Sequence, residues 1–534
     1  MKDIAMKPLL LFSLAATLSA QVSFDRIVNA NKEPQNWLTY SGTLLGQRHS
    51  LLGQITPENV KNLEQQWVWQ ARSLEKFEAT SLVVDGVLYT VQAPNDVVAL
   101  DAATGRPFWT FNYTPSRDAR VCCGRVNRGL AILGDTLFMG TIDAHLLAID
   151  ARTGRLLWNT QTARAADGYA ITLAPLVVKD KVIVGTAGGD FEIRCFLAAY
   201  DARTGKEAWR FNTVAGPDEP GSTSWTGDAW KKGGAAVWVT GSYDSDTNTT
   251  YWGTGNPGPD WNGEGRTGDN LYTNSVVALD ADTGKLKWYF QFSPHDEFDY
   301  DSTQVPVLAD MEWQGRPRKV MLWANRNGFM YVLDRTSGQF LLGKPFVKVT
   351  WAAGLDDSGR PVRPPGSFPT PQGNQLFPAV LGGTNWYSPS YSPRTGFFYI
   401  PSDDNTSALF TREGFPRPVS PVGLGAAMLE KNVRTEEEGY GAIRAYDPRT
   451  GQRKWEFKMS NLTMGGILTT TTNVLFSGGR EGYFFALDAR DGKLLWKVPL
   501  GGQISSGPMS YSINGRQYVA VAAGNALVSF ALRQ

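Results

Sequence analysis

Residues 148–158 read Ala148-Ile-Asp-Ala-Arg-Thr-Gly-Arg-Leu-Leu-Trp158, and this stretch decides the fold because it recurs along the chain. The recurring elements are an Asp, a Thr-Gly pair and a Trp at fixed spacing. Copies and near-copies run from Asp to Trp at 101–109, 201–209, 280–288, 447–455 and 488–496. Weaker echoes stand at 334–338 and 393–396. A unit that returns at intervals of roughly 40 to 80 residues indicates a repeat architecture.

Each unit predicts the same local structure. A β-branched run such as Val182-Ile183-Val184 predicts a strand. The Asp and Thr-Gly then predict a tight turn in which Gly takes a positive φ, and a second strand ends at the Trp. One such sheet cannot bury both faces alone, whereas sheets stacked radially can, with each indole packed against the next sheet's turn. We therefore predict an all-β fold, an eight-bladed β-propeller.

The alternative is a row of separate small domains, but no linker-like segment separates the units. The Pro- and Gly-rich stretches 355–373 and 413–439 lie within the repeats, and we interpret them as long surface loops. Long insertions lie between Trp209 and Asp280 and between Gly396 and Asp447. These insertions are places to search for a site, because loops on a rigid scaffold carry binding residues.

The composition of the 534 residues excludes several classes of protein. Hydrophobic residues make up 42% and charged residues 19%, which fits neither a disordered chain nor a multi-span membrane protein. Lys and Arg number 52 and Asp and Glu 51, so the net charge is +1. Such a balance gives no reason to expect nucleic acid or an anionic membrane as partner.

The N-terminus predicts export. Lys2 and Lys7 precede an apolar run from Pro8 to Leu18, and Ser19-Ala20 follow as small residues near a cleavage site. The run is too short to span a bilayer, so we interpret residues 1–20 as a secretory signal peptide; a buried N-terminal helix is the alternative. Residues 21–534 are then one propeller domain, with no membrane span, in the periplasm.

Three cysteines are few for an exported protein, and two are adjacent, at Cys122 and Cys123. Export favours oxidation, yet a bridge between neighbours closes no long loop and would act only locally. Cys195 is interpreted as a buried apolar residue. The sequence contains no Cys-x-x-Cys-His, which excludes covalent c-type haem.

The Trp-containing repeat together with Cys122-Cys123 and the following Gly-Arg-Val-Asn-Arg128 resembles the quinoprotein alcohol dehydrogenases. These enzymes use pyrroloquinoline quinone (PQQ) on an eight-bladed propeller. The resemblance runs from about Asn36 to the C-terminus. It implies that a disulfide between Cys122 and Cys123 covers one face of the quinone and that Trp238 covers the other. Taken without the family pattern, Trp238 would be interpreted as a blade Trp.

The resemblance also implies the polar contacts of the cofactor. Arg128 matches the arginine that binds a PQQ carboxylate, a role that suits its planar fork. Further cofactor contacts are implied for Glu78, Thr172, Gly188, Gly189, Arg326, Asn385 and Trp386. Two departures from the family pattern, Ala236 and Met464, stand near the expected pocket and suggest altered substrate contacts.

Metal ligation in this family uses hard oxygen donors, and the matching positions are a carboxylate after Gly188-Gly189, then Asn256, then Asp299. The family has Glu at the first position. An ungapped alignment places Asp190 there, while Glu192 would serve after a small local shift. We favour Asp190, and the choice stays open at this point.

The segment 294–301, Pro-His-Asp-Glu-Phe-Asp-Tyr-Asp, resembles the catalytic segment of the family, with Phe298 where Trp is usual. Asp299 matches the general base that takes the proton of the substrate hydroxyl; a carboxylate beside a cation normally has a lowered pKa. Asp301 occupies the position of an extra Asp in lanthanide-using members. A further negative ligand suits a trivalent ion, so a lanthanide is favoured over Ca²⁺, with a solvated turn Asp as the alternative.

The sequence thus predicts a PQQ- and metal-dependent alcohol dehydrogenase that oxidises a small primary alcohol and passes electrons to a soluble c-type cytochrome. The alternatives are a non-catalytic propeller scaffold, as in outer-membrane assembly lipoproteins, and a family member that has lost activity. Neither the particular alcohol nor the oligomeric state follows from the sequence, and a homodimer is one open arrangement.

Overall fold

The computed structural model describes residues 22–412 and 439–533. The predicted signal peptide and almost all of the predicted loop 413–439 lie outside the described residues. In the described part of the chain, helices are few and short, and none has the length and apolar character needed to cross a membrane. The helix α1 spans Phe24–Val28, and the 3-10 helices are η1 (Ala30–Lys32), η2 (Val60–Asn62), η3 (Ala165–Asp167), η4 (Gly189–Phe191), η5 (Ser222–Ser224) and η6 (Ala229–Lys232).

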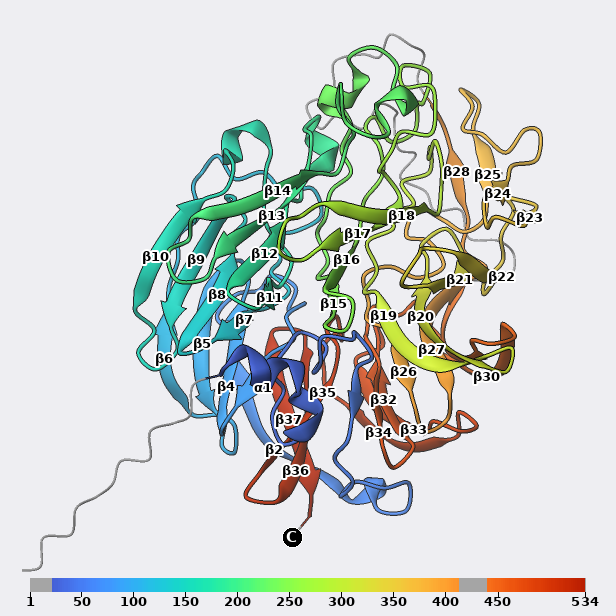
Figure 1. Cartoon of the computed structure of the whole chain (residues 1–534). Coiled ribbons are helices and arrows are strands. Elements are labelled where there is room, and N and C mark those ends of the chain that lie inside the picture. The colour runs from blue at the N-terminus through green and yellow to red at the C-terminus, as the bar shows by residue number, and fades with distance from the viewer. Residues whose placement is uncertain (1–21, 413–438, 534) are drawn as a thin grey trace, which may run out of the picture.

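Eight sheets, seven of four strands and one of five, surround a common axis (Figure 1). This arrangement confirms the predicted eight-bladed propeller. The first four sheets are β3 (Leu82–Val84), β4 (Val87–Gln92), β5 (Asp96–Asp101), β6 (Pro107–Phe111); β7 (Ala131–Leu133), β8 (Thr136–Gly140), β9 (His145–Asp150), β10 (Leu156–Gln161); β11 (Leu176–Val178), β12 (Lys181–Gly185), β13 (Phe196–Asp201), β14 (Glu207–Asn212); and β15 (Ser242–Asp244), β16 (Thr249–Gly253), β17 (Ser275–Asp280), β18 (Leu286–Gln291).

The other four sheets are β19 (Val307–Trp313), β20 (Arg316–Ala324), β21 (Phe329–Asp334), β22 (Phe340–Pro345); β26 (Ser390–Ser392), β27 (Phe397–Asp404), β29 (Tyr440–Asp447), β30 (Gln452–Lys458); β1 (His49–Ser50), β31 (Leu468–Thr470), β32 (Val474–Gly478), β33 (Tyr483–Asp488), β34 (Leu494–Pro499); and β2 (Leu63–Gln70), β37 (Ala526–Leu532), β36 (Arg516–Ala523), β35 (Met509–Ile513). Two small additional sheets pair β23 (Gly354–Leu355) with β24 (Pro361–Val362) and β25 (Asn374–Leu376) with β28 (Ala408–Phe410), so the predicted loop 355–373 carries a short hairpin.

Neighbouring strands are antiparallel and follow chain order, as in β11-β12-β13-β14, except that β1 pairs parallel with β31 and that one sheet runs β2-β37-β36-β35. The first strand is buried throughout and the fourth is largely exposed, so the first strand lies nearest the axis. The repeated turn between the third and fourth strands has the predicted form. At Gly154 (φ 72°) the backbone N–H donates to the carbonyl of Asp150, and the Asp150 carboxylate accepts the N–H groups of Arg152 and Thr153.

Each repeated indole contacts the neighbouring sheet. The N–H of Trp158 donates to the carbonyl of Ala202 at 3.2 Å, and a Cβ atom placed on Gly205 would collide with the same indole ring. Trp67, Trp109, Trp209 and Trp455 make the same hydrogen bond to Ala102, Ala151, Ala281 and Ala489. The indole therefore joins adjacent sheets by both a hydrogen bond and ring packing on a Cβ-free turn.

Two segments close the ring. The N-terminal strand β2 pairs antiparallel with the C-terminal strand β37, from Leu63↔Leu532 to Gln70↔Ala526. Residues 35–50, here called the N-terminal belt, run across the first strands. Their backbone is hydrogen-bonded to six strands of six different sheets, at Val83 (β3), Tyr243 (β15), Leu308 (β19), Tyr391 (β26), Thr469 (β31) and Ser512 (β35).

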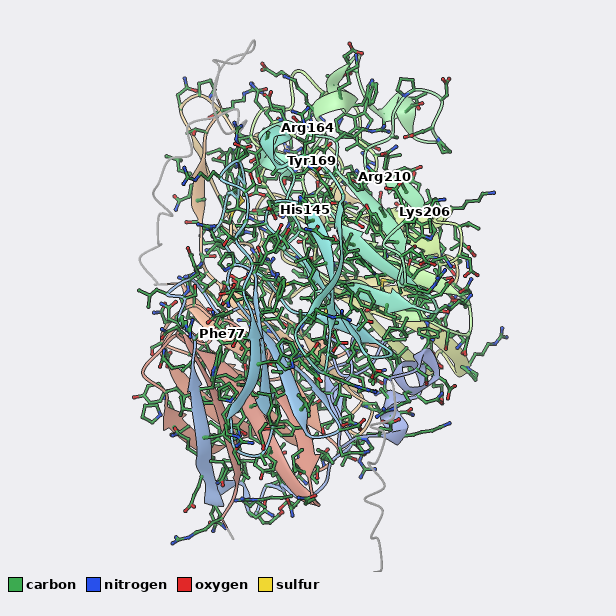
Figure 2. The ribbon with its side chains drawn as sticks, turned by 90° about the vertical axis from the view of Figure 1, so that its left-hand side faces the viewer. Phe77, His145, Arg164, Tyr169, Lys206 and Arg210 are labelled. Atoms are coloured by element: carbon green, nitrogen blue, oxygen red, sulfur yellow. A yellow bond between two sulfur atoms is a disulfide. The ribbon has the colours of Figure 1, made fainter. Side chains whose placement is uncertain are left out.

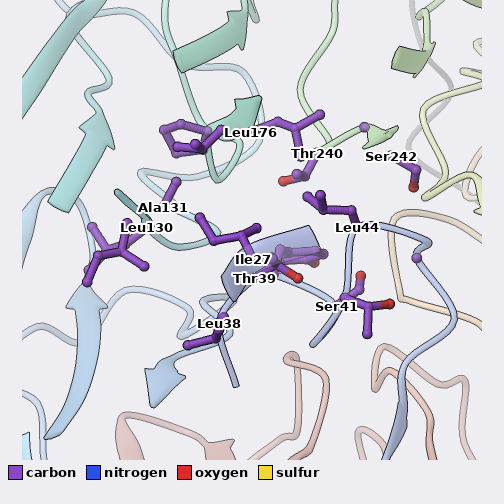
Figure 3. A pocket seen from close by; sticks show the side chains of 17 residues that line it. Ile27, Leu38, Thr39, Ser41, Leu44, Leu130, Ala131, Leu176, Thr240 and Ser242 are labelled. Carbon is purple, nitrogen blue, oxygen red and sulfur yellow. The ribbon is translucent and has the colours of Figure 1, made fainter. Parts of the chain in front are cut away.

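The belt is packed as well as hydrogen-bonded. Leu38 and Leu44 of the belt and Ile27 of α1 line a small pocket with Leu130, Ala131 and Leu176, which belong to or adjoin β7 and β11 (Figure 3). Arg48 is fully buried on this side, and its guanidinium donates to the carbonyls of Tyr40 and Pro508. The belt thus covers buried strand edges that would otherwise be unpaired.

Candidate active site

A cavity of about 210 Å³ lies at one end of the sheets. Seven sheets contribute a residue from the segment just before the first strand, and these residues are Glu78, Arg128, Thr172, Trp238, Asp301, Trp386 and Met464. A second set follows the second strand of its sheet and includes Asp190, Asn256 and Arg326. Both positions lie at the same end of an antiparallel sheet, which is why residues far apart in sequence meet here.

The structure brings nearly all of the predicted site residues together. The cavity lining includes Glu78, Cys122, Cys123, Arg128, Thr172, Gly188, Gly189, Asp190, Trp238, Asn256, Asp299, Asp301, Arg326, Asn385 and Trp386. Glu192 is not among the lining residues. Trp238 lies before β15 rather than at the end of an outer strand, so it is not a blade Trp.

Arg128 is the centre of a buried polar and aromatic group. Its guanidinium pairs with Glu78 at 2.8 Å and donates to the Thr172 hydroxyl at 3.1 Å. The guanidinium carbon also lies 4.8 Å from the ring centroid of Trp238 and 5.1 Å from that of Trp386. The Arg128 Nε is buried and has no acceptor among the described residues. This N–H is therefore an unused donor in the cavity wall, which is what an acidic ligand requires.

Cys122 and Cys123 form a disulfide in the structure, and both residues are exposed while they line the cavity. The bond therefore stands between the cavity and the outside as part of its rim. Cys195, by contrast, is a fully buried free thiol, as its interpretation from sequence predicted.

The turn after β12 places Asp190 and Glu192 in different surroundings. These are the two candidate metal ligands between which the sequence did not decide. Gly188 has φ 108°, and a Cβ there would collide with the carbonyl of Gly168, so this position requires glycine. The next turn, η4, carries Asp190 into the cavity wall, whereas Glu192 reverses direction at φ 60° and pairs with Lys232 at 2.8 Å. Tyr169, labelled in Figure 2, donates from its hydroxyl to the Arg194 carbonyl next to this turn.

Arg326 bridges the two carboxylates of the predicted catalytic segment. Its Nη2 contacts Asp299 at 2.9 Å and its Nη1 contacts Asp301 at 3.1 Å. Asp301 also accepts the indole N–H of Trp238 at 3.1 Å and the backbone N–H of Asn256 at 2.7 Å. Asp299 has φ 59°. One of its carboxylate oxygens accepts a hydrogen bond from Arg326, and its other oxygen lies outside this network. The carboxylates of Asp299 and Asp301 therefore face one common cation, the Arg326 guanidinium.

Burial has the largest effect on the pKa values of the carboxylates in this cavity wall. It raises the pKa of Asp190 to about 6, and the nearby Asp301 contributes in the same direction. Burial also raises the pKa of Asp299 well above its usual range, although Arg326 opposes the rise. The sequence predicted a lowered pKa for Asp299, which is not what the structure gives. Desolvation disfavours the charged carboxylate, and the Arg326 guanidinium, which Asp299 shares with Asp301, does not offset it; a cation of higher charge would be needed.

The donor set fits a hard metal ion and an acidic, planar cofactor. Carboxylate oxygens of Asp190, Asp299 and Asp301 and the amide of Asn256 are oxygen ligands of the kind that Ca²⁺ and lanthanides take. In residues 22–412 and 439–533, no three His, Cys, Asp or Glu side chains already converge as a metal cluster. For the cofactor, the free Arg128 donor and the flat Trp238 and disulfide surfaces supply charge pairing and stacking.

The sequence reasoning missed several lining residues, among them Lys76, Arg120, Leu381 and Tyr387. Each lies within five positions of a residue that it did find, on a segment that leads toward a first strand. Their place on a segment that leads toward a first strand was the signal that could have identified them. Phe298, a departure from the family pattern, does not line the cavity; it is buried against Tyr300, Trp351 and Phe410.

Comparison with known proteins supports the same interpretation. The family described as "Glucose/ethanol/alcohol dehydrogenase, beta-propeller domain" matches residues 37–349, and that of outer membrane protein assembly factor BamB matches residues 439–533. The chain is 38% identical over 538 residues to the quinoprotein alcohol dehydrogenase PedH of Pseudomonas putida, covering 96% of this chain and 90% of PedH. It is 36% identical to a quinoprotein ethanol dehydrogenase of Pseudomonas aeruginosa, covering 96% and 89%.

Solved structures agree. The quinohemoprotein alcohol dehydrogenase ADHIIG of Pseudomonas putida HK5 superposes with a TM-score of 0.90 at 34% identity, covering 97% of this chain and 83% of that one. A europium-containing methanol dehydrogenase superposes with a TM-score of 0.86 at 31% identity, covering 95% and 100%.

Proposed function

Because this chain belongs to the family of PQQ-dependent quinoprotein alcohol dehydrogenases, we propose that it is a periplasmic enzyme that oxidises a small primary alcohol to the aldehyde and reduces a soluble c-type cytochrome. The observation that carries the proposal is one cavity in which the Cys122–Cys123 disulfide, the Arg128 group and the Asp299–Arg326–Asp301 network meet. PQQ, when bound there, supplies the two-electron acceptor for the alcohol.

The cofactor would be held by the residues that form the cavity walls. Arg128 and Thr172 supply hydrogen-bond donors for its carboxylates, with Glu78 keeping the guanidinium in place. Trp238 and the disulfide offer flat surfaces for the ring system. Gly188, Gly189, Asn385 and Trp386 complete the enclosure, which excludes water and fixes the orientation of a rigid ligand.

The metal would be held by oxygens of Asp190, Asn256, Asp299 and Asp301, and it would supply Lewis acidity next to the cofactor. Glu192 is left out, because it lies outside the cavity lining and pairs with Lys232. Asp190, Asp299 and Asp301 all line the cavity, and three carboxylates around one ion would favour a trivalent lanthanide over Ca²⁺, since like charges need a strong positive charge to coexist.

Asp299 is the residue proposed to accept the proton of the substrate hydroxyl. The Arg326 fork fixes one of its oxygens, which leaves the other available to the substrate. Arg326 is itself fixed by a hydrogen bond to the Val380 carbonyl at 2.8 Å, so the base is held from behind by a rigid support.

The electrons would leave to a separate protein, since this sequence contains no covalent c-type haem motif. One relative, from Thauera butanivorans, bears the name 1-butanol dehydrogenase (cytochrome c), which supports a cytochrome as acceptor. The scaffold alternative loses its support, because the match to the assembly factor is confined to residues 439–533 while the dehydrogenase relatives cover nearly the whole chain.

The test is reconstitution of the metal-depleted protein with PQQ and either La³⁺ or Ca²⁺, followed by ethanol oxidation with an artificial electron acceptor and then with a soluble c-type cytochrome. We expect activity with both ions, higher with La³⁺. The Asp299→Asn variant should retain bound PQQ, seen by absorbance, and lose ~100- to 10,000-fold in kcat, the usual contribution of a general base.

Glu192→Gln is the matched control: it neutralises a carboxylate near the site but outside the cavity, and its activity should equal that of the wild type. Full activity of Asp299→Asn would refute the assigned base. Higher activity with Ca²⁺ than with every lanthanide tested would refute the metal preference.

A further inference from the structure

Asp260 is a buried carboxylate directly behind the proposed metal site. It lies in the segment that follows β16, four residues after Asn256, and is 1% exposed. Its Oδ1 accepts the Nδ2 of Asn256 at 2.8 Å, whereas its Oδ2 is buried with no hydrogen-bond partner among the described residues. Asp260 does not line the cavity, so it would reach a ligand there through Asn256.

Nothing nearby neutralises this carboxylate directly. The nearest guanidinium, Arg266, donates to the backbone carbonyls of Pro259, Asp260 and Asp296 and to the Asn270 side chain, not to the Asp260 carboxylate. No ion pair of Asp260 is found in the part of the chain that the structure describes. A buried, unpaired carboxylate is costly to fold around, which calls for a compensating role.

The hydrogen bonds of Asn256 define which end of its amide faces the cavity. Its Nδ2 donates to Asp260 and, at 3.3 Å, to the Pro257 carbonyl. Its backbone N–H donates to Asp301, and its backbone carbonyl accepts from Ala235. Only the side-chain oxygen has no partner among the described residues, and Asn256 lines the cavity. With the nitrogen held on the Asp260 side, the oxygen is the atom presented to a cation.

We propose that Asp260 is a positioning residue of the metal site, which fixes the Asn256 amide with its oxygen toward the ion. The inference rests on the proposed function, because it assumes that the ion binds at Asp190, Asn256, Asp299 and Asp301. The role assigned to Asp260 is one orienting hydrogen bond, and two substitutions test it, one that keeps an acceptor for the Asn256 Nδ2 and one that removes it.

The experiment is calorimetric titration of La³⁺ and of Ca²⁺ into the metal-depleted, PQQ-loaded protein. Asp260→Asn keeps an oxygen that can accept the Asn256 Nδ2, and we expect its La³⁺ and Ca²⁺ affinities to equal those of the wild type. Asp260→Ala removes the acceptor, and we expect a ~10- to 100-fold loss of La³⁺ affinity. The thermal midpoint of each variant shows that it is folded.

Asp403→Asn is the matched control, since it removes another buried, unpaired carboxylate that contacts none of the proposed ligands; its metal affinities should equal those of the wild type. If Asp260→Ala binds La³⁺ as tightly as the wild type, the inference is wrong while the metal site stands. If the wild type binds neither ion, the metal site of the proposed function fails, and the inference fails with it.

Discussion

Side chains in this protein acquire their roles from backbone turns that sequence spacing alone does not resolve. Asp190 and Glu192 are two positions apart and chemically equivalent, so the sequence left the choice between them open. The left-handed conformation at Gly188 and again at Glu192 carries the first into the cavity and turns the second toward Lys232. Arg326 and Asp301 were predicted as separate contacts, but their mutual ion pair could not be, because it depends on the relative position of two sheet ends.

Asp403 provides a prediction at the scale of one residue. Burial raises its pKa to about 7, so the folded protein holds a proton that the unfolded chain releases above pH ~4. The free energy of unfolding contributed by this group therefore falls as pH rises from about 4 to about 7. Asp403→Asn keeps an acceptor for the Thr463 N–H and has no such proton to lose. We expect the variant to be more stable than the wild type at pH 8, by up to several kcal/mol.

The measurement is calorimetric thermal unfolding of both proteins at pH 5 and at pH 8. The gain in thermal midpoint of the variant should be large at pH 8 and shrink toward pH 5. A variant that is less stable than the wild type at pH 8, or a gain that does not depend on pH, would contradict the prediction.

At the scale of elements, the recurrent turn was readable in advance because every part of it is local. The Asp, the Thr-Gly pair and the Trp stand at fixed spacing and predict both strands and the turn between them. The weaker echo at 334–338 still ends a third strand, β21, and begins a fourth, β22, in which Leu342 and Lys344 take the place of an indole against Gly451. The residue that accepts the indole hydrogen bond lies 34 to 72 positions further on, from Trp455–Ala489 to Trp209–Ala281.

Two glycines in similar conformations test the contact between sheets. Gly284 (φ 68°) has the Trp209 ring where a Cβ would stand, whereas Gly315 (φ 77°) has no atom within 4 Å of that point. Gly315→Ala should cost only the backbone penalty of a positive φ, about 1 kcal/mol. Gly284→Ala should cost a further ~1–3 kcal/mol, because the indole must be displaced. Thermal midpoints measured for both variants check this, and equal midpoints would show that the contact does not matter.

At the scale of the whole molecule, closure depends on pairings that leave no local trace in the sequence. The number of sheets followed from counting repeats, but the pairing of β2 with β37 joins residues 63–70 to residues 526–532. The N-terminal belt likewise contacts strands of six different sheets, from Val83 to Ser512. Neither segment carries the repeat pattern, so their roles were not predicted. The sequence predicts the repeated sheets, but only the structure shows which segments close the ring.

Closure by β37 gives a prediction on the entire chain. A protein that ends after Ala523 lacks β37, which leaves the long strand β2 without a partner and β36 paired with β35 alone. We expect it to show no cooperative thermal transition and to retain no PQQ. A protein that ends after Leu532 keeps every pairing of β37 and should unfold within about 1 °C of the full chain, since surface residues contribute little. Cooperative unfolding of the shorter protein would show that seven sheets suffice.

The N-terminal belt bears on where small molecules can enter and leave the cavity. The space on its outer side, bordered by Trp37, His49 and Asp244, shares no lining residue with the catalytic chamber. The exposed residues of the cavity lining are Lys76, Arg120, Cys122, Cys123 and Gly124, so the cavity opens at the rim that carries the disulfide. The product of the proposed reaction would leave through the same opening by which the substrate enters, so accumulated product should slow turnover.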